Sequence, residues 1–374
     1  HGVSPLLYWR LYKDGKSGGK GMFVPADVKD ELESDFYTTA ARALLAERQL
    51  AEVLSVLARA GVSALVIKGA AVGTFYPDPA LRPYGDLDLL VSQAQLKQSE
   101  EALNRLGYRC STSKEWWSEH FYHLPPMVGD QGSLVVEIHW RLDHEDAVGR
   151  LPAEDLGARA VPWSVAGQRA LRLDPVDTVL HLCRHAVVQH RARLGLRPLC
   201  DLAQVTDGWG QKEWDTLVQR TAGYDQARAG YLAFALAQQS LGLDVPAVVM
   251  AALRPAGALP LPDGLADSLL TLGTSMAAQV PVAVVQAGGQ GTLAARLRYF
   301  LWHLFLPRDG MAVLYEIPAD SPRIWLAYLR RPVHLLRRYG ASTWDALRGR
   351  QEAHEVWQRE IWLERWLAGE ARAR

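Results

Sequence analysis

The fold of this chain is constrained most by three short apolar segments. Segments of helical periodicity separate them. The three apolar segments are "SALVIKG" (63–69), "YGDLDLLV" (84–91) and the alternating "SLVVEIHWRL" (133–142), and each has the length and composition of a β-strand. Helices are expected over 27–60, from Gly69 to about Pro77, and over 93–106. The resulting order, helix and strand in alternation, predicts a compact α/β or α+β unit. Of the two we expect the α+β class, with helices that flank a small mixed sheet.

The pattern changes after about residue 172, because nearly every later segment has helical character. The first of these, "DPVDTVLHLCRHAVVQHR" (174–191), begins with Asp174, a suitable N-cap, and Pro175, which fits a first helical turn. We therefore expect two domains: residues 1–172 form the core with its N-terminal helices, and residues 173–374 form a large all-helical region.

Two of the predicted helices have apolar side chains that we expect to be buried. In the segment 27–60 the apolar positions at helical spacing are Leu44, Leu45, Leu50, Val53, Leu54 and Leu57. The basic segment "RIWLAYLRRPVHLLRRYG" (323–340) interleaves arginines with aromatic residues. Such a pattern suits nucleic acid or a membrane surface, but we favour a helix that buries its apolar residues, Trp325, Leu326, Tyr328 and Leu329, and exposes its arginines.

The charge balance argues against a polyanionic partner, since the 374 residues include 41 basic and 41 acidic side chains. Binding to nucleic acid is therefore open but not favoured. Cys110, Cys183 and Cys200 are too few and too far apart for a disulfide framework. The opening "HGVSPLLYWR" lacks the order of a signal peptide, and no apolar run is long enough to cross a bilayer. These features predict a cytoplasmic protein without a membrane partner.

The second apolar segment contains two carboxylates that share one face. Side chains at i and i+2 of a strand point the same way, so Asp86 and Asp88 lie together while Leu87 and Leu89 face the core. Two neighbouring carboxylates repel each other unless a cation lies between them. Oxygen ligands of this kind favour Mg²⁺ or Mn²⁺. The segment therefore predicts a divalent-metal site, against the alternative of two charges on a solvated strand edge.

Three neighbouring features support a site that handles phosphate. Lys68 and Gly69 close a strand and open a helix, where backbone N–H groups and a point charge suit a phosphate. Arg82 lies in the turn before the aspartates, and we expect it to contact a phosphate or to neutralise the aspartates. Glu137 and His139 share a face of the third apolar segment, so Glu137 is a candidate third carboxylate. Three carboxylates beside a phosphate cradle are typical of two-metal phosphoryl transfer.

The amino-acid sequence of these segments resembles that of a known family. The run "LVIKGAAV", "YPDPALRPYGDLDLLV", "LNRLGY" and "VVEIHWRL" is similar to the bacterial uncharacterised nucleotidyltransferase family of the polymerase-β-type superfamily. A related Lys-Gly, Arg and Asp-x-Asp arrangement occurs in toxin-like nucleotidyltransferases of phage-defence systems. The resemblance implies a nucleotidyltransferase core that moves a nucleoside monophosphate from an NTP to an acceptor hydroxyl and releases pyrophosphate. The acceptor would be a small molecule, a peptide or protein, or RNA.

The resemblance also implies roles for individual residues. Asp86, Asp88 and Glu137 would hold Mg²⁺ or Mn²⁺, with Glu137 also a candidate general base. The residues expected to contact the nucleotide are Lys68, Gly69, Ala70, Arg82, His139 and His185. This chain departs from the pattern twice: Glu137 replaces a more usual aspartate, and Gly69-Ala70 replaces a more usual Gly-Ser. Metal binding should survive both changes, whereas catalysis is more sensitive to them.

Three alternative hypotheses compete with this interpretation. A sugar-nucleotide-dependent glycosyltransferase also uses Asp-x-Asp, but it normally places a longer α/β half before the motif. A catalytically weak binding or toxin–antitoxin protein would keep the fold for recognition. His181 and His185 have a zinc-compatible i, i+4 spacing, but no acid or thiol follows at a matching distance, so we favour a supporting role for them. The sequence does not identify the NTP, the acceptor or the oligomeric state.

Overall fold

The computed structural model describes most of the chain and divides it into two compact units. The described residues are 2–14, 23–110, 117, 121–144, 147–257, 261–262, 264–266, 294, 297–298, 301, 304–315, 317, 320–347 and 351–369. The first unit comprises residues 1–190 and 194–254, and the second comprises 191–193 and 255–374. Helices as far as residue 253 thus share a unit with the sheet, and the predicted domain boundary at residue 172 stays a prediction.

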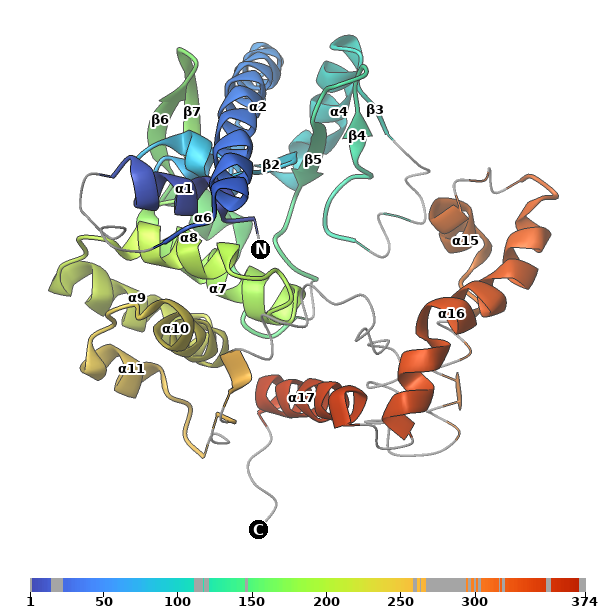
Figure 1. Cartoon of the computed structure of the whole chain (residues 1–374). Helices are drawn as coiled ribbons and strands as arrows, with labels where there is room; N and C mark the ends of the chain where they lie inside the picture. Colours follow the sequence, from blue (N-terminus) through green and yellow to red (C-terminus); the bar gives the residue numbers. More distant parts are fainter. Residues whose placement is uncertain are drawn as a thin grey trace. The chain divides into compact units, whose positions relative to one another are not determined.

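The first unit is built on a mixed seven-stranded sheet in the order β3-β4-β5-β2-β1-β7-β6 (Figure 1). β2 pairs with β5, and β1 with β7, in parallel, whereas the other neighbours are antiparallel. The strands are β1 (Leu65–Val66), β2 (Asp86–Leu90), β3 (Arg109–Cys110), β4 (Met127–Val128), β5 (Val135–His139), β6 (Val161–Val165) and β7 (Gln168–Arg172). The predicted α+β class is confirmed.

Helices flank this sheet in the first unit. They are α1 (Ser4–Tyr12), α2 (Ala26–Arg59), α3 (Ala70–Gly73), α4 (Leu96–Arg105), α6 (Ala153–Ala158), α7 (Pro175–Arg184), α8 (Arg197–Thr206), α9 (Gln211–Gly223), α10 (Ala227–Leu241) and α11 (Ala247–Leu253). Short 3₁₀ turns lie at Pro79–Leu81 and Gln93–Gln95. As predicted, Asp174 caps α7, because its side chain accepts a hydrogen bond from the backbone N–H of Asp177.

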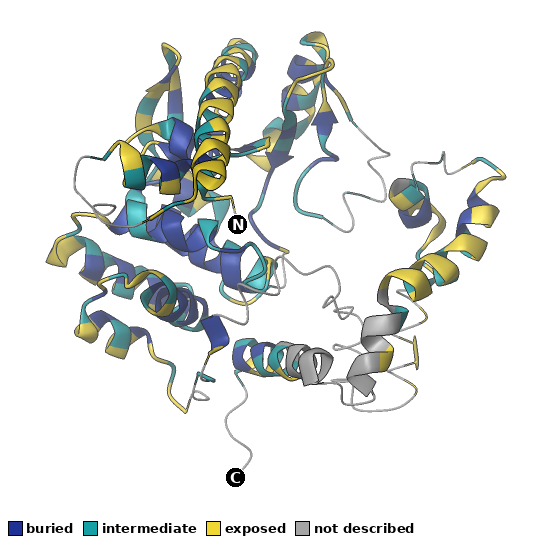
Figure 2. Ribbon diagram, viewed as in Figure 1, coloured by how far each residue is buried: buried dark blue, intermediate teal, exposed yellow. Residues whose placement is uncertain are grey.

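The main hydrophobic core lies between α2 and one face of the sheet. Leu50 and Val53 of α2 are fully buried there together with Leu89 of β2 and Val136 and Ile138 of β5. Figure 2 shows both buried and exposed residues along α2. Full burial of one such side chain contributes about 1.5–3 kcal/mol. Because side chains alternate along a strand, this packing fixes the orientation of β2 and β5 and directs their polar residues to the opposite face.

The buried stripe of α2 differs from the prediction at its start. Leu44 and Leu45 are 64% and 66% exposed, so the prediction that they are buried is wrong. The stripe passes instead through Ala43 and Ala46, one turn apart, which places both leucines on other sides of the helix. The helix expected from Gly69 to Pro77 is also shorter, since α3 ends at Gly73.

The β6–β7 hairpin was not predicted from the sequence. Its turn contains Ala166 and Gly167, both at positive φ, which a two-residue hairpin turn of type I′ requires. Pro162 lies within β6 and weakens its strand signal. The structure tolerates this proline because β6 is the edge strand of the sheet, where a missing backbone donor breaks no ladder.

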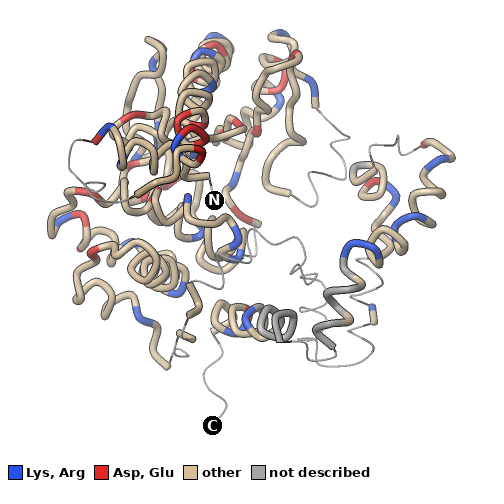
Figure 3. The backbone as a smooth tube through the Cα atoms, viewed as in Figure 1, with Lys and Arg blue, Asp and Glu red and all other residues tan. Residues whose placement is uncertain are grey.

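The second unit contains α15 (Arg308–Tyr315), α16 (Ile324–Leu347) and α17 (Gln351–Ala368). Ile324 and Ala327 of α16 are buried, and the Tyr328 hydroxyl donates to the carbonyl of Leu306. Trp325, Leu326 and Leu329 are 64%, 52% and 73% exposed, so the prediction that α16 buries them is wrong. They lie beside, not on, the packed face that follows Ile324, Ala327 and Tyr328. Arginines recur along α16 (Figure 3). None of the helices in the described ranges combines the length and apolarity of a bilayer-spanning segment.

Candidate active site

The parallel pairing of β2 with β5 brings the predicted acidic residues together. The register places Asp88 opposite Glu137, and Leu90 opposite His139. Neighbouring strands lie about 4.8 Å apart, so these side chains are within contact distance on the face opposite α2. The prediction that carboxylates from two separate strands converge is confirmed for Asp88 and Glu137.

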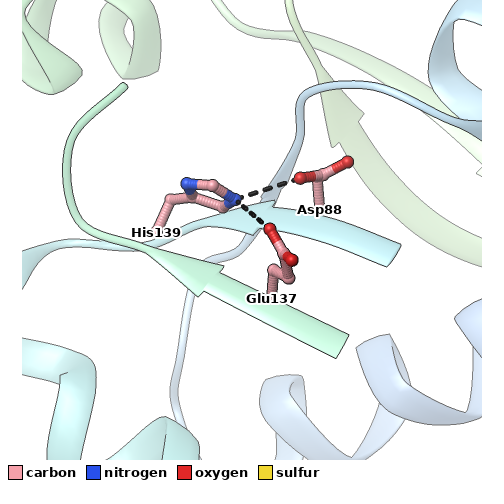
Figure 4. A group of neighbouring side chains, drawn as sticks. All are labelled: Asp88, Glu137 and His139. Carbon is pink, nitrogen blue, oxygen red and sulfur yellow. Dashed lines mark hydrogen bonds and ion pairs between the residues drawn. The ribbon is translucent and has the colours of Figure 1, made fainter. Parts of the chain in front are cut away.

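Asp88, Glu137 and His139 form a compact cluster (Figure 4). His139 Nε2 lies 3.0 Å from Asp88 Oδ1 and 3.5 Å from Glu137 Oε2. One potential ligand atom from each side chain lies within 4.8 Å of the other two, and no other such group of three occurs among the residues that the structure describes. His181 and His185 thus belong to no three-residue metal group there, in line with the supporting role favoured from their spacing.

Lys68 supplies the positive charge of this cluster. Its Nζ lies 2.9 Å from Asp88 Oδ1, and Asp88 is only 2% exposed. Burial raises the pKa of Asp88, but Lys68 and the hydrogen bond from His139 outweigh burial and hold that pKa well below its usual range. Burial also lowers the pKa of His139, yet its bonds to Asp88 and Glu137 raise the pKa overall. The cluster therefore pairs an ionised Asp88 with two nitrogen donors.

Asp86 faces the same side of β2 as Asp88 but lies outside the cluster. Burial and the negative charge of Asp88 raise the pKa of Asp86, while Lys68 opposes them. Within the described ranges its half-buried carboxylate has no hydrogen-bond or ion-pair partner. An unpartnered carboxylate that is repelled by its neighbour fits a divalent cation, which would relieve both penalties. The role of Asp86 as a metal ligand stays a prediction.

Gly69 joins β1 to α3 next to the acidic strand. Its φ of +55° suits glycine, and an added Cβ would lie 3.2 Å from the Tyr84 ring and 3.5 Å from the carbonyl oxygen of Asp86. The following helix, which starts at Ala70, is a single turn of four residues. So short a helix has little dipole. A phosphate at Gly69-Ala70 would therefore depend on the backbone N–H groups and on Lys68 more than on a helix dipole.

Arg82 has protein partners that differ from the predicted ones. Its guanidinium donates two hydrogen bonds to Asp201 in α8, at 2.7 and 2.8 Å, and one to the carbonyl of Gly69 at 3.3 Å. Tyr76 donates to the same Asp201 carboxylate at 2.7 Å. Arg82 is 6% exposed. These contacts give it a role in holding the Gly69 turn to α8, and its contact with a phosphate stays a prediction.

A pocket of about 230 Å³ opens beside the cluster. Lys68, Glu137, His139 and His185, all predicted site residues, line it. The pocket wall also contains residues without a predicted site role, namely Tyr122 and the imidazoles of His123, His181 and His190. The i, i+4 spacing of His181 and His185 hinted at this group, and His190 follows five residues later, but Tyr122 and His123 come from a distant segment.

Comparison with known proteins assigns about two thirds of the chain to one family. A family model described as "Uncharacterised nucleotidyltransferase" matches residues 1–242, which include every residue discussed in this section. No curated protein matches the chain.

Proposed function

Because the chain belongs to the uncharacterised nucleotidyltransferase family, we propose that it transfers a nucleoside monophosphate from an NTP to an acceptor hydroxyl and releases pyrophosphate. The observation that carries this proposal is the pairing of β2 with β5, which groups Asp88 and Glu137 on one face beside Lys68. Asp86, on the same face of β2, adds a third carboxylate. Carboxylates next to a lysine suit the transfer of a phosphoryl group.

Asp86, Asp88 and Glu137 would hold Mg²⁺ or Mn²⁺ in this reaction. The bound metal would lower the pKa of the acceptor hydroxyl and offset negative charge on the α-phosphate. His139 supports this arrangement, since its Nε2 donates to Asp88 and lies close to Glu137, which orients both carboxylates. Its predicted contact with the nucleotide is a further part of the proposal.

The remaining roles belong to groups that bind substrate or move a proton. Lys68 and the backbone at Gly69 and Ala70 would contact the phosphates, and Glu137 would accept the proton of the acceptor hydroxyl. The hydrogen bond from His139, opposed by burial, lowers the pKa of Glu137, so this carboxylate is ionised and able to accept a proton at neutral pH. Arg82 and His185 would complete the nucleotide site. The acceptor would be a small molecule, a peptide or protein, or RNA.

The proposal is tested by incubating the full chain with each α-labelled NTP, Mg²⁺ or Mn²⁺, and pools of hydroxyl-bearing acceptors. We expect pyrophosphate release and transfer of label to one acceptor class. We also expect EDTA to stop both and excess Mn²⁺ to restore them, because the carboxylates need the cation to accommodate a triphosphate. Thermal-shift measurements with NTPs and with sugar nucleotides serve as the comparison. Stabilisation by sugar nucleotides alone, or by neither class of ligand, would contradict the proposal.

A further inference from the structure

One wall of the pocket beside the carboxylates consists largely of imidazole rings. His181, His185 and His190 come from consecutive turns at the end of α7 and the segment that follows it. The ring centroids of His181 and His185 are 5.8 Å apart, and those of His185 and His190 are 4.3 Å apart. The three rings therefore form a continuous row, which we call the imidazole row.

The backbone that carries this row is irregular where the rings meet the pocket. Residues His185–Gln189 form a π-helical turn, and Gln189 also lines the pocket. Such turns are rare and occur often at functional sites. The two residues after His190, Arg191 and Ala192, both have positive φ, which non-glycine residues seldom adopt. Residues with such uncommon backbone conformations cluster at active sites and ligand-binding sites.

His181 has a ring nitrogen that lacks a partner. The residue is 3% exposed, and its Nε2 is buried without a hydrogen bond to any described group. Buried polar atoms are nearly always hydrogen-bonded, so this nitrogen calls for a ligand atom in the pocket. Its neighbours in the row already use one another, because His185 Nε2 and His190 Nε2 are 3.1 Å apart.

The electrostatics of the pocket favour an anionic ligand. Burial and the nearby Lys68 charge lower the pKa of His181 to about 3, and the same two causes lower the pKa of His185 and of His190. The rings are therefore neutral beside an ammonium group. An anion in the pocket would attract Lys68 and accept a hydrogen bond from His181, and His185 and His190 would donate to it in place of their mutual hydrogen bond. Glu137 also lines the pocket, and its contact with His139 offsets the negative charge of its carboxylate.

We infer that the imidazole row binds the β- and γ-phosphates of the NTP. Lys68, which follows β1, contacts the same phosphates from another wall of the pocket. This inference rests on the proposed function. It adds His181 and His190 to the nucleotide site and assigns the row to the leaving pyrophosphate, not to the base, the sugar or the acceptor. Lys68 supports this assignment, because it lines the pocket and also precedes the Gly69 turn where the phosphates are proposed to bind.

Inorganic tripolyphosphate and a nucleoside monophosphate separate the two ends of the nucleotide. Their affinities would be measured by calorimetry in Mg²⁺ with the full chain and with His181→Leu, His185→Ala and His190→Ala. Each substitution should weaken tripolyphosphate and NTP binding by about 10-fold, because each removes a hydrogen bond to a charged group. Monophosphate affinity should change by less than about twofold. His334→Gln, in exposed α16, is the matched control and should change neither affinity.

His190 is exposed, so its variant tests the inference even if the buried His181→Leu fails to fold. Tripolyphosphate affinity that stays unchanged in the His185 and His190 variants would overturn the inference. Equal losses for tripolyphosphate and monophosphate, or a wild-type chain that binds no tripolyphosphate, would overturn it too. Tripolyphosphate binding without any nucleotidyl transfer would reject the proposed reaction and leave the anion site standing.

Discussion

Asp86→Asn should leave the protein at least as stable as the wild type while reducing pyrophosphate release by about 1000-fold. The half-buried Asp86 carboxylate has no partner in the described part of the chain and is repelled by Asp88, so a neutral amide removes an unfavourable charge. In the proposed reaction, the same change would also weaken a ligand for the divalent cation. The measurements are the free energy of unfolding in urea and the steady-state rate of pyrophosphate release.

The pH dependence of stability gives an independent check of this argument. Because burial and Asp88 raise the folded-state pKa of Asp86, its charged carboxylate destabilises the fold most above that pKa. This destabilisation is lost progressively as the pH falls from the folded-state pKa to the lower pKa of the unfolded chain. The advantage of Asp86→Asn should therefore shrink as the pH falls and Asp86 takes up its proton. Asp244→Asn, an exposed acid in the same unit, is the control and should change neither stability nor rate. Full activity of Asp86→Asn would remove Asp86 from the site.

Arg82→Met should destabilise the first unit by about 3–5 kcal/mol and lower its Tm by about 10 °C. The guanidinium makes two charge-assisted hydrogen bonds to Asp201 and is 6% exposed, so its removal leaves a buried carboxylate that only Tyr76 contacts among the groups identified here. The substitution also removes the hydrogen bond to the carbonyl of Gly69, so the Gly69 turn should loosen. Thermal unfolding followed by circular dichroism measures the effect.

A second pair of variants separates this structural role from a direct contact with phosphate. Arg82→Met with Asp201→Leu removes both charges and should recover much of the lost stability, as paired removal of buried ions often does. If Arg82 acts through the turn, Asp201→Asn should weaken NTP binding about as much as Arg82→Met does. Nucleotide binding that is lost in Arg82→Met but kept in Asp201→Asn would instead assign Arg82 to the phosphates.

Residues that alternate along a strand could be placed from the sequence. The buried face of β2 is fixed by Leu87 and Leu89. Val136 and Ile138 fix the buried face of β5 in the same way. Both sets of polar residues were therefore expected on one side. The local pattern does not show which strand lies next to which. The parallel register that sets Glu137 against Asp88, and not Asp86, emerges only in the structure.

Contacts between distant segments could not be predicted. Asp201 lies 119 residues from Arg82, and no local pattern marks it as the partner of that arginine. Lys68 was expected to face phosphate, yet its Nζ contacts Asp88, since the ends of β1 and β2 meet across an antiparallel pair. The imidazole row meets Lys68 and Glu137 in one pocket, and no local pattern shows that these distant segments come together.

The most direct test of the account is a crystal structure of the full chain with Mn²⁺ and a non-hydrolysable NTP. Anomalous scattering distinguishes Mn²⁺ from water and from lighter ions. The account predicts an anomalous peak within about 2.5 Å of carboxylate oxygens of Asp86, Asp88 and Glu137, with the triphosphate on the side of Lys68. A metal bound elsewhere, or a nucleotide that leaves these three carboxylates without a cation, would contradict it.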